Sequence, residues 1–146
     1  MTGTCRCGQV KLSVTDAPVA TFACHCTGCQ RMTASAFSLS ALYPQDALTV
    51  EGDTVLGGIK GDLRHHFCPS WLYTTADIMD PFVNIRTTMF ENGPALTVPF
   101  IECWTDEKLP WTQTGARHAY PGFPPEEAFM ELLSEYAASR QSSAPV

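Results

Sequence analysis

The chain has 146 residues, of which 45% are hydrophobic, and a formal net charge of −6. This length and composition suffice for one hydrophobic core, so we expect a single domain over residues 1–139, followed by a flexible tail, 140–146, rich in Ser and Ala. The acidic balance, without any run of Lys or Arg, argues against nucleic acid and anionic membranes as partners. The sequence does not predict the oligomeric state.

The location of the protein is indicated by its apolar segments and by its cysteines. We find neither a basic region followed by an apolar stretch nor a run of roughly 18 apolar residues, which favours a cytoplasmic protein without a membrane partner. Seven cysteines are many for a chain of this size in that compartment. In a reducing environment they point to metal binding or catalysis more than to disulfides.

The predicted elements are mostly strands. Val10, Leu12 and Val14 alternate with polar residues, which predicts a strand after a tight turn of Cys5–Gly8. Further strands are predicted at residues 21–24, 36–43, 48–51, 64–68, 72–76, 83–89 and 96–104. Turns are predicted at 52–53, 57–58, 61–62 and 92–94, where glycine occurs with aspartate, a second glycine, or asparagine and proline.

One long helix is predicted near the end of the chain. Pro124 and Pro125 are suited to its start, and Glu126 and Glu127 would oppose the helix dipole in the first turn. Apolar residues follow at helical spacing: Phe129, Leu132, Leu133 and Tyr136. The fold class predicted is therefore mainly β with one C-terminal helix that packs on the sheet.

The strongest functional signal is the group Cys24, Cys26 and Cys29. Residues two apart share one side of an extended segment, and the CxxC turn that follows brings a third thiol to the same point. A structural zinc site normally has four protein ligands, whereas a catalytic site has three and leaves one position open. This triplet therefore suggests an open zinc site. His25 between the first two cysteines is interpreted as a hydrogen-bonded or surface imidazole.

A second group is predicted from Cys5, Cys7 and Cys68. The first two cysteines repeat the spacing of two residues before a strand, and Cys68 follows an extended segment, so a long-range site is sterically reasonable. Each lone cysteine could instead be a small buried apolar side chain. That interpretation is preferred for Cys103, which lies in an apolar segment.

Four stretches resemble a known family: Gly3–Val10, Cys24–Arg31, Ala34–Phe37 and Arg64–Pro69. In order and spacing they are similar to the glutathione-dependent formaldehyde-activating (GFA) family, which also contains the domain of centromere protein V. The resemblance implies a β-tent of packed antiparallel sheets with zinc knuckles. It also implies two zinc sites, a structural one formed by a CxC pair with a distant CxxC, and a catalytic one formed by the CxCxxC group.

Carried over to this chain, the resemblance implies Cys5, Cys7 and Cys68 as structural ligands and the triplet from Cys24 to Cys29 as the catalytic ones. The distant family motif is Phe-Cys-x-x-Cys-Gly, but this chain has Trp71 where the second cysteine is expected. Trp cannot bind zinc. His66 is a possible replacement ligand, because it shares a strand face with Cys68; alternatively the site keeps a water or is filled by the indole.

The activity that the resemblance implies is that of a carbon-sulfur lyase, which condenses a small aldehyde such as formaldehyde with a thiol such as glutathione, using one or two zinc ions per chain. Candidates for holding the carboxylates of the thiol substrate are Arg31 and Arg64, and also Lys60 and Arg86, although each is also interpretable as a solvated surface charge. Two alternatives remain open. One is a non-catalytic zinc module that recognises a protein partner, and the other is a metal-free redox sensor built on the CxxC of Cys26 and Cys29.

Overall fold

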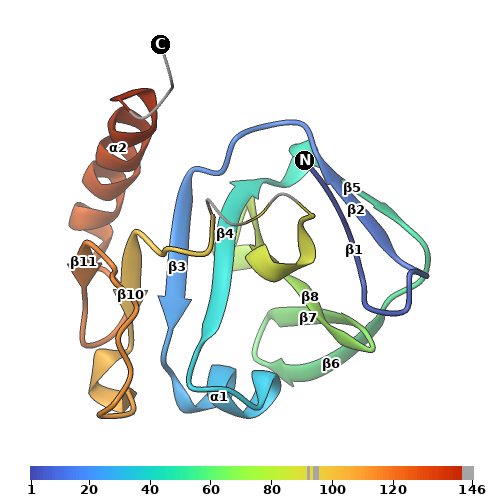
Figure 1. The fold of residues 1–146 in the computed structure, drawn as a ribbon, viewed down its shortest axis with the longest axis horizontal. Coiled ribbons are helices and arrows are strands. Elements are labelled where there is room, and N and C mark those ends of the chain that lie inside the picture. Colours follow the sequence, from blue (N-terminus) through green and yellow to red (C-terminus); the bar gives the residue numbers. More distant parts are fainter. Residues whose placement is uncertain (92, 94–95, 143–146) are drawn as a thin grey trace.

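The computed structural model describes residues 1–91, 93 and 96–142, which form two sheets and two helices (Figure 1). The strands are β1 (Thr2–Thr4), β2 (Lys11–Val14), β3 (Ala20–Cys24), β4 (Ser38–Pro44), β5 (Leu48–Glu51), β6 (Val55–Lys60), β7 (Leu63–Cys68), β8 (Ser70–Thr75), β9 (Phe82–Arg86), β10 (Ile101–Cys103) and β11 (His118–Ala119). The helices are α1 (Thr27–Thr33) and α2 (Glu126–Ser142). The prediction of a mainly β fold with a C-terminal helix is confirmed.

The two sheets differ in size and pairing. The smaller has the order β1-β2-β5 and is antiparallel throughout. The larger has the order β11-β10-β3-β4-β9-β8-β7-β6. It is antiparallel from β3 to β6, whereas β10 runs parallel to both β3 and β11. The late segment containing β10 is thereby attached beside the strand that leads into the first cysteine triplet.

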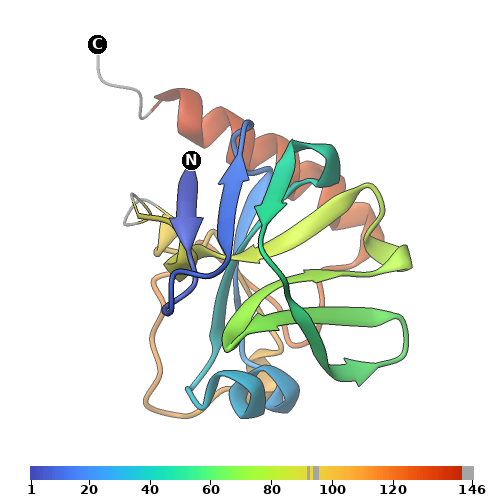
Figure 2. The ribbon, with the colours of Figure 1, turned by 90° about the vertical axis from the view of Figure 1, so that its right-hand side faces the viewer.

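The core has two parts, one on each face of the large sheet. Between the two sheets lie apolar residues that include Leu12, Tyr43, Leu72, Val83 and Ile85. On the other face α2 packs on β3 and β10, as Figure 1 shows, through contacts that include Leu132 and Tyr136. The turned view of Figure 2 shows α1 apart from α2, at the end of the sheets where β3 stops. Both faces of the sheet are therefore covered, and the residues at its end are left for the site.

Several predicted boundaries are wrong. Residues 57–58 are not a turn but lie inside β6, because Gly57 can lie flat against Phe67, whose ring is 3.3 Å from where a Cβ would be. The strand predicted for 83–89 ends at Arg86, and Thr87–Met89 form a 3-10 turn. The strand predicted for 96–104 is confined to β10. Helix α1 was not predicted.

Two other features concern the ends of the chain and the membrane. Helix α2 continues to Ser142, which is beyond the start of the predicted tail, while residues 143–146 lie outside the described residues. Of the turn predicted at 92–94, only residue 93 is described. Within the described residues, no helix has the length and apolar character needed to cross a membrane.

Candidate metal centre

The triplet Cys24, Cys26 and Cys29 converges at the junction of β3 and α1. Cys24 is the last residue of β3, Cys26 caps the N-terminus of α1, and Cys29 lies in its first turn. The Cys26 sulfur accepts a hydrogen bond of 3.3 Å from the Cys29 backbone N–H. All three Sγ atoms lie within 4.8 Å of one another. Sulfurs that share a tetrahedral zinc ion are about 3.8 Å apart, so this group fits one ion with an open fourth position.

The three thiols are electrostatically linked. A hydrogen bond from Cys24, together with one from Cys29, lowers the pKa of Cys26 to about 2. A hydrogen bond with the neighbouring Cys103 raises the pKa of Cys24, and one with Cys24 raises the pKa of Cys29. Cys26 is therefore the thiol of the three that ionises most readily. A bound divalent cation would favour deprotonation of the other two, since coordinating thiols are ionised.

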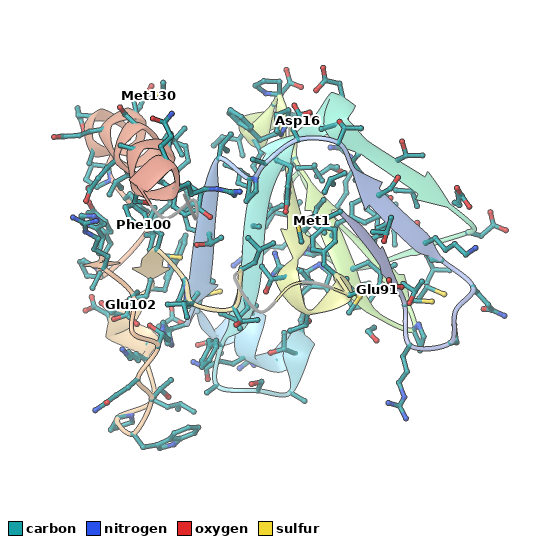
Figure 3. The ribbon with its side chains drawn as sticks, turned by 45° about the horizontal axis from the view of Figure 1, so that its top comes forward. Met1, Asp16, Glu91, Phe100, Glu102 and Met130 are labelled. Atoms are coloured by element: carbon teal, nitrogen blue, oxygen red, sulfur yellow. The ribbon has the colours of Figure 1, made fainter. Side chains whose placement is uncertain are left out.

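His25 is fully buried between the first two cysteines, and its Nε2 lies 3.2 Å from Glu102 Oε2. Glu102, on β10 and labelled in Figure 3, also accepts hydrogen bonds from Lys108 Nζ at 2.8 Å and from Thr114 Oγ1 at 2.8 Å. Burial lowers the pKa of His25. The hydrogen-bonded interpretation of His25 is therefore the one observed, and its role is to tie the cysteine segment to β10.

Helix α1 is fastened by residues that the sequence did not single out. Glu107 accepts hydrogen bonds from the backbone N–H and the hydroxyl of Thr27. Gln30 Nε2 donates to the carbonyls of His25 at 2.6 Å and Glu107 at 3.0 Å. The 3-10 turn Thr105–Glu107 is thus attached to the helix that carries Cys29.

Arg86 is buried at the centre of the large sheet, with its guanidinium carbon 3.9 Å from the centre of the Trp71 ring. Burial lowers its pKa to about 10, and the nearby Cys29, Cys24 and Cys103 oppose this shift, so Arg86 stays cationic at neutral pH. Its interpretation as a solvated surface charge is wrong. Cys103 is buried as expected, but it also lies beside Cys24.

The second group joins Cys5, Cys7 and Cys68. Sulfur to sulfur distances are 3.3 Å from Cys5 to Cys7 and 3.8 Å from Cys7 to Cys68. A hydrogen bond from the Val10 N–H lowers the pKa of Cys5 to about 7. The amide oxygen of Gln9 lies 3.6 Å from the Cys7 sulfur and 4.0 Å from that of Cys68. Around a tetrahedral zinc ion, sulfur to sulfur distances are about 3.8 Å and sulfur to oxygen distances about 3.6 Å. The distances from the Cys7 sulfur to Cys68 and to Gln9 equal these values, whereas the Cys5 to Cys7 distance is shorter and the Cys68 to Gln9 distance is longer.

Two residues discussed for the missing fourth ligand are engaged elsewhere. His66 does not join the group of three cysteines, and its Nδ1 lies 3.0 Å from Thr54 Oγ1 while its ring stacks on Tyr73. Trp71 is buried and donates a hydrogen bond of 3.0 Å to Thr74 Oγ1. The indole therefore packs around Arg86 and Thr74.

The candidate substrate-binding arginines have different surroundings. Arg31 is exposed on α1 and lines a surface pocket. The other residues that line it are Thr27, Gln30, Ala34, Ser35, Ala36, Leu109 and Trp111. Arg64 is paired with Asp77 at 3.0 Å, and Lys60 is exposed. Among the exposed candidates, Arg31 is thus the one that lies on α1, the helix that contains Cys29.

Comparisons with known proteins bear on the family and on the fold. The model of the family described as glutathione-dependent formaldehyde-activating enzyme (GFA) matches residues 1–107. A crystal structure of a Rhodobacter sphaeroides protein has a similar fold, with a TM-score of 0.53, 22% identity, and coverage of 63% of this chain and 89% of that one. No curated protein matches. Because the family model spans more than two thirds of the sequence, including both cysteine groups, this chain belongs to the GFA family.

Proposed function

We propose that this protein is a zinc-dependent enzyme of the carbon-sulfur lyase type, which condenses formaldehyde or a similar small aldehyde with a thiol such as glutathione. The observation that carries the proposal is the open group of Cys24, Cys26 and Cys29 in a chain of the GFA family. Three thiols leave one position of a tetrahedral ion for a small ligand, as in catalytic zinc sites. A reducing cytoplasm suits these free thiols and supplies glutathione.

The residues of the site would have distinct roles. Cys24, Cys26 and Cys29 would hold zinc, which supplies Lewis-acid chemistry and stabilises a deprotonated thiol. His25, bound to Glu102, keeps the ligand segment against β10. Arg31 lines the pocket beside α1 and can pair with a carboxylate of glutathione, and we retain Arg64 as a weaker candidate because Asp77 already neutralises it.

The group of Cys5, Cys7 and Cys68 is proposed as a structural zinc site. It connects the turn between β1 and β2 with the end of β7, so a bound ion would hold the N-terminal segment to the large sheet. Gln9 is the donor best placed to complete the coordination, by its distances to two of the sulfurs. The proposed cofactor content is therefore two zinc ions per chain, one of each kind.

The reaction is tested by exchange NMR with 13C-formaldehyde and glutathione, which measures the rate at which S-hydroxymethylglutathione forms and breaks down. We expect the zinc-loaded protein to accelerate this exchange and Cys24→Ser to abolish the acceleration. Met130→Ser is the control, because this residue is exposed on α2, outside both cysteine groups, and its substitution should keep the rate. An exchange rate equal to that without protein would contradict the proposal.

The redox alternative has one observation in its favour, namely that the lowered pKa of Cys26 beside Cys29 is typical of reactive CxxC pairs. In that case treatment with a mild oxidant would lower the number of free thiols per chain by two in the wild-type protein but not in Cys29→Ser. Adding a chelator beforehand would not change this number. Protection of the same thiols by bound zinc would instead support the lyase. We find no comparable observation in favour of a non-catalytic module that binds a protein partner.

A further inference from the structure

Arg86 is a buried cation without an acidic partner. Its side chain is 5% exposed, and its Nε has no hydrogen-bond partner. Among the residues that the structure describes, no ion pair with a carboxylate includes Arg86. A buried charge is unfavourable unless a ring, a dipole or an opposite charge compensates it.

Strand register places Arg86 on the same face of the large sheet as one cysteine of the triplet. Cys24 on β3 faces Ser38 on β4, and Ser40 on β4 faces Arg86 on β9. Because residues two apart on a strand point to the same side, Cys24 and Arg86 project from the same face of the large sheet. Arg86 interacts electrostatically with Cys24, Cys29 and Cys103. The ligands of a metal-loaded triplet, which would be thiolates, are thus placed where they can balance the guanidinium.

Trp71 fixes the guanidinium in this place. Its ring lies against Arg86, as described above, and its Nε1 donates to Thr74 Oγ1. Thr74 Oγ1 in turn lies 2.8 Å from His65 Nδ1, and the His65 ring meets the indole edge-on at 5.0 Å. A cation held over an indole away from water is favourably placed. The residue that stands where the family pattern has a zinc ligand therefore packs against Arg86.

We propose that Arg86, held by Trp71, compensates the charge of the Cys24, Cys26 and Cys29 centre and makes this centre select an anionic ligand, a thiolate, over a neutral ligand of similar size. A divalent ion with three thiolates has one net negative charge, and a thiolate ligand adds a second. A fixed cation nearby offsets the added charge, whereas it gives a neutral ligand no such benefit. This inference rests on the proposed function and assigns the open position to the thiol.

The test uses the full chain loaded with Co(II), whose spectrum reports the ligands of the ion. The protein is titrated with 2-mercaptoethanol and, separately, with imidazole at the same pH, and the ratio of the two affinities is determined. We expect Arg86→Met to lower this ratio on the order of ten-fold, and Arg86→Lys to retain most of it. A ratio unchanged in Arg86→Met would overturn the inference.

Both affinities, for 2-mercaptoethanol and for imidazole, are measured on the same protein sample. Partial unfolding of a variant would lower both and would leave their ratio unchanged. Trp71→Leu is a second variant that keeps the charge but removes the ring, and it should lower the ratio by less than Arg86→Met. If the wild-type protein shows no cobalt-thiolate absorption that depends on Cys24, the proposed function and this inference both fail. If the absorption is present but the ratio does not respond to Arg86, only the inference fails.

Discussion

At the scale of single residues, Gln9 and His66 are the two candidates for the missing ligand of Cys5, Cys7 and Cys68. The Gln9 oxygen lies near two of the sulfurs, whereas His66 is engaged with Thr54 and Tyr73. We predict that Gln9→Leu lowers the zinc retained after dialysis against a weak chelator, while His66→Leu leaves it unchanged. Mass spectrometry of the metal per chain measures both. Loss of zinc in the His66 variant alone would show that His66 is the ligand.

His65 gives a prediction about pH. Burial, and then the charge of Arg86, lower its pKa, so the folded protein keeps the ring neutral while the unfolded chain takes up a proton near pH 6.5. The stability associated with His65 is therefore complete above pH 6.5 and is lost as the pH falls below it, by up to about 1.4 kcal/mol per pH unit.

This loss is measured by urea unfolding of the wild type and of His65→Gln at pH 7.5 and pH 5.5. The free energy of unfolding should fall less in the variant than in the wild type over this interval. Equal losses in the two proteins would mean that His65 does not contribute to the pH dependence.

At the scale of elements, α1 depends on its contacts more than on its own sequence. It has seven residues, which are too few for a stable isolated helix. It is anchored by the two hydrogen bonds that Thr27 donates to the Glu107 carboxylate. We predict that Glu107→Ala costs about 1 kcal/mol of stability, as loss of a helix cap does, and speeds the release of zinc from the triplet.

The matched control is Asp106→Ala, which removes an exposed neighbouring carboxylate. Zinc release is followed with a chromogenic chelator in all three proteins. Equal release rates in the Glu107 variant and the wild type would contradict the anchoring role.

The elements that could be predicted are those with a local signal. Strand β2 follows from alternation, and α2 from its prolines, glutamates and apolar spacing. Strand β6 was missed because its glycines resemble a turn, while it is stabilised by antiparallel pairing with β7. Helix α1 was missed because the cysteine spacing was interpreted as a turn, and its fastening to Glu107 links residues 80 positions apart.

At the scale of the whole molecule, the fold assembles the site from distant segments. The two cysteine groups could be predicted from spacing and family resemblance, since most of their members are close in sequence. Glu102 could not, and Arg86 could be named only as a candidate for binding the substrate's carboxylates, because β10 must first pair with β3, and β9 with β4, before the two residues come near the triplet. The residues of β9 and β10 that lie near the triplet were therefore not visible in any local motif.

The same topology separates the two proposed zinc sites by function. One group, with Cys68, lies where the N-terminal turn meets the large sheet, and the other lies where β3 meets α1. An ion in the first would stabilise the fold, and an ion in the second would bind the substrate. The two groups can be tested separately, because no cysteine is shared between them.

The central claim is tested most directly by zinc content per chain, measured by mass spectrometry on protein purified without a metal-affinity tag. We predict about two zinc ions per chain in the wild type, and about one in each of Cys24→Ser and Cys5→Ser. Zinc that is absent from the wild type, or that is unaffected by Cys24→Ser, would contradict it.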